Sequence, residues 1–233
     1  GGGMFNYLNF PNLTNCTFSG NTASNGGGMY NNSGFATPIV LTDCTFSGNT
    51  ASNDGGGMFN SGANLTITNC TISGNTASDD GGGMFNTGGM PVMTNCVISG
   101  NVATSAGGAM FNTNSADPSI KNCTISGNKA SYGGVMYNDW YASPTISNTI
   151  IFGNNSGIVN YYMNTVTITY SLVQGVGSGT GNINGNTDPM FVNPQPASAA
   201  PTIAGNYRLQ PSCGPTINMG NNSAVPAGIT TDL

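Results

Sequence analysis

A block of sequence that recurs along the chain constrains its fold more than any other feature. Gly-Gly-Gly-Met-Phe-Asn, a variable loop and Asn-Cys-Thr-Phe/Ile-Ser-Gly-Asn-Thr-Ala return at intervals of about 26 residues until position 157. The copies begin at Gly1, Gly26, Gly55, Gly81, Gly107 and Gly133. Each copy contains three short runs of β character and lacks the apolar i, i+3, i+4 spacing of a helix. The repeat therefore predicts a solenoid of stacked coils whose parallel strands lie about 4.8 Å apart.

Charge and composition exclude several functions. The chain has three lysines and arginines, eight acidic residues, no histidine and a net charge of −5. A nucleic-acid partner is not expected, because binding phosphates requires a basic face. No apolar run approaches the ~20 residues of a membrane span, so this segment is not expected to insert into a membrane. Because it starts without an initiator methionine or signal peptide, we interpret it as a mature or excised segment.

Alternation along the first strand of each coil predicts which side chains face inward. The methionines of the repeat share one parity with the following asparagines, and we place both sets in the core. The aromatic residues between them then point outward, flanked by glycines that carry no side chain. These outward residues, which we call the aromatic row, are Phe5, Tyr30, Phe59, Phe85, Phe111 and Tyr137.

The second strand of each coil is expected to carry two further core ladders and to lead into a third. The cysteine ladder comprises Cys16, Cys44, Cys70, Cys96 and Cys123, and a Phe/Ile ladder follows two residues later. The asparagine ladder at the next turn comprises Asn21, Asn49, Asn75, Asn101, Asn128 and Asn154, whose amides can hydrogen-bond along the solenoid. A line of single thiols does not converge on a metal, and disulfides would leave one of the five unpaired. We favour buried reduced thiols. Cys213 lies outside this array.

The repeat decays after Asn155, and we divide the chain into a β-helix over residues 1–174 and an irregular tail over residues 175–233. We expect the tail to cap the last coil or to run back along the solenoid. Its main apolar anchors, Phe191 and Tyr207, could cover the aromatic row. Another protomer or a glycan stacked on the rings are the alternative occupants of the row.

The sequence offers no convincing catalytic or metal site. Without histidine, a Ser-His-Asp or Cys-His arrangement is impossible. Asp54 and Asp80 share one phase in neighbouring coils, with Asp79 beside them, so a calcium site or a glycosidase pair is conceivable. We favour exposed turn residues, because Asn25 and Ala106 occupy the same place in the adjoining coils. We therefore predict no catalytic residue, no metal and no cofactor.

The repeat elements quoted above resemble those of bacterial secreted right-handed parallel β-helix proteins, including the passenger repeats of polymorphic outer-membrane proteins. The tail resembles the endings of large anchored β-helix surface proteins at Tyr170–Gly175, at Asp188–Val192 and from Tyr207 to Gly220. These motifs cover nearly the whole chain. The resemblance implies an all-β, right-handed, single-stranded parallel β-helix of about seven coils. It also implies secretion and a cell-surface or extracellular location.

We predict a non-catalytic extracellular protein with a structural or adhesive role, whose partner is another copy of itself or a surface glycan. An uncovered terminal coil exposes unpaired strand edges, so head-to-tail stacking into a filament or surface layer is plausible. A carbohydrate-active or carbohydrate-binding β-helix is the main alternative. An ice-binding solenoid is a remote one, because the row of Thr22, Thr50 and Thr76 is broken by Val102 and Lys129.

Overall fold

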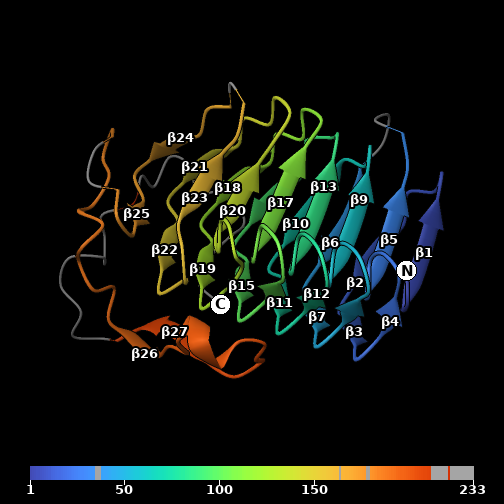
Figure 1. The fold of residues 1–233 in the computed structure, drawn as a ribbon, viewed down its shortest axis with the longest axis horizontal. Helices are drawn as coiled ribbons and strands as arrows, with labels where there is room; N and C mark the ends of the chain where they lie inside the picture. Colours follow the sequence, from blue (N-terminus) through green and yellow to red (C-terminus); the bar gives the residue numbers. More distant parts are fainter. Residues whose placement is uncertain (35–37, 163, 177–178, 211–219, 221–233) are drawn as a thin grey trace.

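The chain forms a parallel β-solenoid whose coils stack along one axis from the N-terminus, with an irregular segment against one side (Figure 1). The computed structural model describes residues 1–34, 38–162, 164–176, 179–210 and 220. The predicted all-β solenoid of repeating coils is confirmed. Within this described part, no helix is long and apolar enough to cross a bilayer.

Three seven-stranded sheets and one four-stranded sheet form the walls. Sheet A contains β1 (Met4–Tyr7), β5 (Met29–Asn32), β9 (Met58–Ser61), β13 (Met84–Thr87), β17 (Met110–Thr113), β20 (Met136–Asn138) and β23 (Ile158–Asn160). Sheet B contains β2 (Asn12–Thr14), β6 (Ile39–Thr42), β10 (Leu65–Thr68), β14 (Val92–Thr94), β18 (Ser119–Lys121), β21 (Thr145–Ser147) and β24 (Thr167–Thr169). Sheet C contains β3 (Thr17–Ser19), β7 (Thr45–Ser47), β11 (Thr71–Ser73), β15 (Val97–Ser99), β19 (Thr124–Ser126), β22 (Ile150–Phe152) and β25 (Leu172–Val173). Sheet D contains β4 (Thr22–Ala23), β8 (Thr50–Ala51), β12 (Thr76–Ala77) and β16 (Val102–Ala103).

Each strand of these four sheets pairs in parallel with its equivalent in the next coil, so residues at equivalent repeat positions stack. In sheet A, Phe85 lies opposite Phe59 on one side and Phe111 on the other. The predicted parity is confirmed, since the methionines from Met29 to Met136 and the asparagines that follow them are buried. Burying such a methionine contributes about 1.5–3 kcal/mol, so the repeated apolar positions account for the folding of each coil.

Two asparagine ladders satisfy the polar groups inside the coils. In sheet A the Nδ2 of Asn86 donates to the Oδ1 of Asn112 at 2.9 Å, and its own Oδ1 accepts from the Nδ2 of Asn60 at 2.8 Å. In the ladder predicted at the turn, the backbone N–H and the Nδ2 of Asn75 both donate to the Oδ1 of Asn101 at 2.9 Å. Because a buried amide without a partner costs free energy, the ladders fix the register of successive coils.

The cysteine ladder is buried as predicted from Cys44 to Cys123, whereas Cys16 in the first coil is partly exposed, and the ladder lies at a corner and not inside a strand. The residue before each cysteine is left-handed, with φ of 56° at Asn69, for example, and this turn separates β10 from β11. Asparagine adopts this conformation more readily than most residues. The sequence-based view of one continuous second strand is therefore wrong. The described cysteines are free, and Cys213 lies outside the described residues.

The glycine runs from Gly26 onward are buried between coils, and only the run of the first coil, at residues 1–3, is exposed. This corrects the expectation that the glycines flank the row as an open strip. Gly55 has a φ of +66°, and a Cβ placed there would lie 2.4 Å from the Met58 carbonyl oxygen. A Cβ on Gly57 would lie 2.6 Å from the carbonyl oxygen of Gly83 in the next coil. The repeat therefore needs glycine because adjacent backbones approach too closely for a side chain.

The described part of the tail runs back along the solenoid beside the turns that follow sheet C (Figure 1). The strand β26 (Phe191–Asn193) pairs antiparallel with β27 (Asn206–Leu209), and the 3-10 helix η1 (Ala197–Ala199) lies between them in sequence. The backbone N–H of Thr202 donates to the carbonyl of Gly100 at 3.0 Å, which attaches this segment to the coil.

Candidate binding surface

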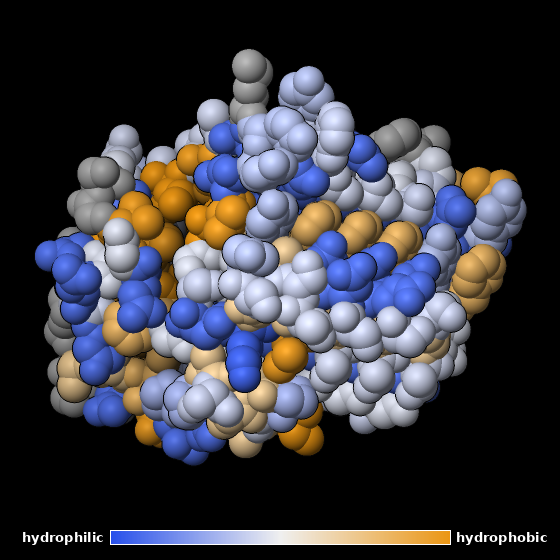
Figure 2. Space-filling view, in the orientation of Figure 1, coloured by the Kyte–Doolittle hydropathy of each residue, from blue (hydrophilic) through white to orange (hydrophobic). Residues whose placement is uncertain are grey.

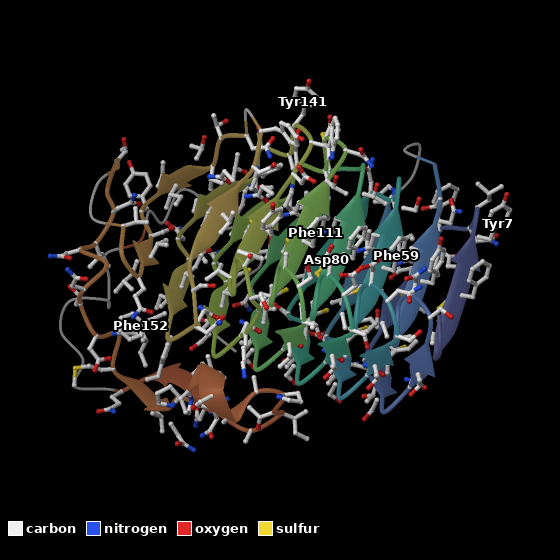
Figure 3. All side chains as sticks on the ribbon, in the orientation of Figure 1. Tyr7, Phe59, Asp80, Phe111, Tyr141 and Phe152 are labelled. Atoms are coloured by element: carbon white, nitrogen blue, oxygen red, sulfur yellow. The ribbon has the colours of Figure 1, made fainter. Side chains whose placement is uncertain are left out.

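The aromatic row forms one continuous stack on the outer face of sheet A. Successive ring centroids from Tyr30 to Tyr137 lie 4.9 to 5.3 Å apart, with planes within 4° to 6° of parallel. Phe5 extends the stack at the N-terminal end, at 5.2 Å from Tyr30. Figure 2 shows a short line of apolar residues where Figure 3 labels Phe59 and Phe111. The interior rings are partly exposed, except Phe111, which is 8% exposed, so the row is an ordered apolar feature set into the surface.

Ring stacking determines what the row can bind. Each interior ring, such as Phe59, has a neighbouring ring against both of its faces. The outer surface therefore presents ring edges, which carry the positive part of the aromatic quadrupole. A sugar therefore cannot lie flat on an interior ring, and a glycan on the row would contact ring edges there. Phe5, which is 61% exposed, is the end ring on the N-terminal side.

Three carboxylates lie beside the row, from the turns that precede β9 and β13. Asp54, Asp79 and Asp80 bring their carboxylate oxygens within 4.8 Å of one another. Figure 3 shows Asp80 close to the labelled Phe59 and Phe111. Burial, and next the charge of Asp79, raise the pKa of Asp54. Burial raises the pKa of Asp80 to about 6.

The hydrogen bonds of these carboxylates favour a structural role. The backbone N–H of Asp54 donates to Oδ1 of Asn25 at 3.1 Å, and that of Asp80 donates to Oδ1 of Asp54 at 3.2 Å. Ala106 continues the series by donating to Oδ1 of Asp80 at 2.9 Å. Each side chain therefore satisfies the backbone of the next coil, as Asn25 does without a charge. Oxygen donors of this kind suit calcium. A glycosidase pair would instead have to face a substrate from both sides of the bond to be cleaved.

Phe191 and Tyr207 do not lie on the aromatic row, which corrects the expectation that they cover it. Their rings pack against each other edge to face at 5.6 Å, and Phe191 is buried. A Cβ on Gly127 would lie 3.3 Å from the Tyr207 hydroxyl, so the tail lies against the turns after sheet C.

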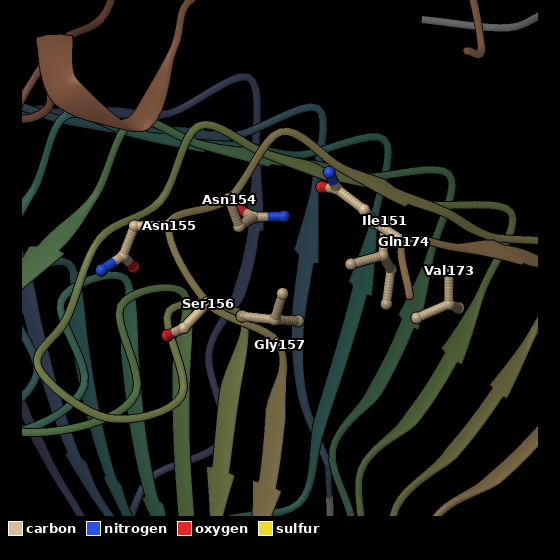
Figure 4. Close-up of a pocket in the computed structure, with 8 residues that line it drawn as sticks. Ile151, Asn154, Asn155, Ser156, Gly157, Val173 and Gln174 are labelled. Carbon is tan, nitrogen blue, oxygen red and sulfur yellow. The ribbon is translucent and has the colours of Figure 1, made fainter. Parts of the chain in front are cut away.

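A hollow of about 200 Å³ opens where the last coils shorten (Figure 4). Val135, Ile151 and Val173 form its apolar part, whereas Asn154 and Asn155 contribute amides. These amides are already used, since the Nδ2 of Asn154 donates to the Ile125 carbonyl at 2.9 Å and that of Asn155 to the Ala130 carbonyl at 2.7 Å. The hollow therefore offers a ligand few free polar groups.

Sequence reasoning missed a second group of exposed aromatic residues. Trp140, Tyr141, Tyr161 and Tyr162 lie in the loops that follow β20 and β23 and are 51% to 62% exposed. The rings of Trp140, Tyr161 and Tyr162 meet at the C-terminal end of the row, where Tyr137 and Tyr161 lie 6.4 Å apart. Two adjacent aromatic pairs outside the repeated positions were the signal that could have revealed this group.

Comparison with known proteins supports the architecture. A family model described as the right-handed beta helix region matches residues 77–195, and the Chlamydia polymorphic membrane protein repeat matches residues 43–57. Searches of curated proteins and of solved structures find no significant match.

Proposed function

Because the chain belongs to the right-handed β-helix family, we propose that it is a non-catalytic extracellular protein of the bacterial surface that works as a rigid adhesive scaffold. One observation carries this proposal, the stacked aromatic row on the outer face of sheet A with carboxylates beside it. Exposed apolar stripes of this kind are characteristic of interaction sites. The similarity to a polymorphic membrane protein repeat supports a location at the cell surface.

Adhesion fits this surface better than catalysis does. The chain has no histidine or glutamate, and two of its three clustered aspartates, Asp54 and Asp80, already accept backbone hydrogen bonds. Because each ring is held by its neighbours, a partner would meet an ordered surface and lose little side-chain entropy on contact. The row presents ring edges beside carboxylates, which suits a partner with matching apolar and hydrogen-bonding groups.

Retention under flow tests the adhesive function. The chain would be displayed on a laboratory bacterium and passed over surfaces coated with glycans, with extracellular matrix proteins or with the chain itself. We expect retention on at least one coating and its loss in the Phe59→Ser/Phe85→Ser variant. Asp43→Asn, which changes a corner residue outside the row, is the matched control. Equal retention of the row variant and the wild type would contradict the proposal.

End-to-end assembly is a second candidate, favoured by a defect in the sheet A ladder at the first coil. Asn6 donates to the carbonyl of Asn9 in its own turn at 2.8 Å, and the buried Oδ1 of Asn31 has no partner. At the opposite end, the exposed Asn160 accepts the last bond of the ladder, from Asn138 at 2.8 Å. If a second copy stacked against the first coil in the same direction, the Nδ2 of its Asn160 could donate to the Oδ1 of Asn6. The Nδ2 of Asn6 could then donate to the Oδ1 of Asn31, which would satisfy that buried oxygen.

The end faces support this polarity. Phe5, Tyr7 and Leu8 expose more than half of their side-chain surface on the first coil. At the last coil the backbone N–H of Ile183 donates to the carbonyl of Ser171 at 3.0 Å, and the Nδ2 of Asn182 donates to the carbonyl of Ile168 in β24 at 3.1 Å. This segment therefore lies against sheets C and B, and sheet A remains for a second copy. Light scattering and negative-stain imaging at increasing concentration test the assembly, and a strictly monomeric species would contradict it.

A further inference from the structure

Four exposed aromatic residues at the C-terminal end of sheet A are here called the aromatic platform: Trp140, Tyr161 and Tyr162, whose rings contact one another, and Tyr141, which follows Trp140 in the same turn. Trp140 and Tyr141 follow β20, and Tyr161 and Tyr162 follow β23, its neighbour in the sheet. The ring centroids of Trp140 and Tyr162 lie 5.0 Å apart with planes inclined by 37°. Tyr161 meets Tyr162 edge to face at 4.5 Å. Unlike the parallel rings of the row, these rings meet at angles and do not cover one another completely.

The preceding coil provides an internal comparison for this turn. Asn114 and Ser115, with φ of 53° and 59°, occupy the places that Trp140 and Tyr141 occupy one coil later, with φ of 43° and 67°. The backbone N–H of Ser115 donates to the carbonyl of Trp140 at 2.9 Å, which aligns the two turns. The residue that follows each pair is a fully buried alanine. The same turn is therefore built by small polar residues in one coil and by large aromatic residues in the next.

The aromatic residues gain little within the chain in return for this conformation. Left-handed backbone is unfavourable for bulky side chains and readily accepted by asparagine, which the chain uses at its corners. Trp140 and Tyr141 nevertheless stay 51% and 62% exposed, so core packing does not explain them. Figure 3 shows Tyr141 projecting from the edge of the solenoid, away from the coils. Left-handed backbone at bulky residues that stay exposed motivates the hypothesis of a binding role here, and the ring contacts of Trp140 with Tyr162 support it.

We propose that the aromatic platform binds a neutral saccharide, whose ring C–H groups lie on the exposed aromatic faces while its hydroxyls reach surrounding polar groups. The loops between the strands carry carboxylates at Asp117 and Asp139 and no lysine or arginine. This negative charge disfavours phosphorylated, sulfated or otherwise anionic ligands. Tyrosine and tryptophan suit such a ligand, because each combines an apolar face with a hydrogen-bonding group.

A lipid surface is the less favoured ligand for the same platform. Interfacial anchors combine aromatic side chains with aliphatic ones and with cations that attract anionic lipids. The turns after β17 and β20 contain polar and acidic residues instead, and their alanines, Ala116 and Ala142, are buried. The saccharide proposal rests on the adhesive function, for which it names a class of ligand. The residues that it uses lie outside the aromatic row.

Trp140 is the only tryptophan of the chain, so its fluorescence reports directly on the platform. The intact chain would be titrated with neutral tetrasaccharides of β-1,4-linked N-acetylglucosamine, glucose, xylose and mannose. We expect a saturable change in emission with at least one of them. Tyr141→Ser and Tyr162→Asn keep the reporter and should weaken that binding about tenfold. Tyr132→Ser, which removes an exposed tyrosine outside the platform, should bind as the wild type does.

Trp140→Asn/Tyr141→Ser reproduces the turn of the preceding coil, so it is expected to fold. Affinity electrophoresis in gels containing the bound polysaccharide should show that this variant is no longer retarded. No response to any neutral saccharide would overturn the proposal, and so would a response only to phosphatidylcholine vesicles or only to anionic oligosaccharides. If no saccharide binds while the row variant still loses retention under flow, the saccharide proposal fails and the adhesive function stands.

Discussion

Replacing Asn86 by leucine tests the physical basis of the solenoid, because it removes one member from the middle of a buried ladder. Asn86 is fully buried and makes two side-chain hydrogen bonds, to Asn60 at 2.8 Å and to Asn112 at 2.9 Å. The Asn86→Leu variant would leave the Nδ2 of Asn60 and the Oδ1 of Asn112 buried without these partners. Each orphaned group costs about 1–3 kcal/mol, so the two together should lower the free energy of unfolding by about 2–6 kcal/mol.

Asn6→Leu is the matched control at the same position of the first coil. Asn6 is also buried, but its amide bonds only within its own turn, and the Oδ1 of Asn31 already lacks a partner. We expect this variant to lose about 1 kcal/mol. Guanidinium unfolding followed by circular dichroism measures both changes, and an unchanged m-value shows that the same transition is compared. Equal losses in the two variants, or a loss below about 1 kcal/mol for Asn86→Leu, would refute the reasoning.

Three further predictions follow from the surface. Burial raises the pKa of Asp80 to about 6 from 3.8, so its contribution to stability is complete below about pH 4 and is lost as the pH rises through about 6. Asp80→Asn should therefore add about 1 kcal/mol at pH 7 after allowance for solvent screening, and flatten the pH dependence of the thermal midpoint; an unchanged pH profile would count against this view. Phe59→Ser/Phe85→Ser breaks three stacking contacts and should lower stability by about 2–4 kcal/mol with an unchanged circular dichroism spectrum, whereas collapse of the whole solenoid would show that the rings are core. Trp140→Asn/Tyr141→Ser should increase the free energy of unfolding by about 1–2 kcal/mol and so raise the thermal midpoint, because it relieves left-handed backbone at bulky residues. A lower midpoint would show that the aromatic pair stabilises the fold.

The features that repeat with a fixed period were predictable from the sequence. Met58, Phe59 and Asn60 alternate in a short strand, and stacking in register follows once each copy forms one coil. The two asparagine ladders follow from the same argument, since the amides recur at one phase. What could not be predicted depends on conformation or on contacts that do not repeat.

Three particular cases show the limit. Asn69 and its equivalents continue an alternating pattern, so the left-handed corner at this position is hidden until the backbone is known. The attachment of Thr202 to Gly100 joins a non-repeating segment to the coils, and no period indicates it. The aromatic platform requires β20 and β23 to be neighbours although the last coil is shorter than the others. The stacking of the row, with ring faces covered, depends on rotamers that the pattern does not specify.

Hydroxyl-radical footprinting of the chain, free and retained on the surface that it binds under flow, tests most directly whether the aromatic row is the working surface. Phe59 and Phe85 are partly exposed in the free chain, so both should be oxidised in solution. Our account predicts that both become protected in the retained chain, while exposed residues away from sheet A, such as Ile203, stay reactive. Unchanged oxidation of Phe59 and Phe85, with protection elsewhere, would contradict it.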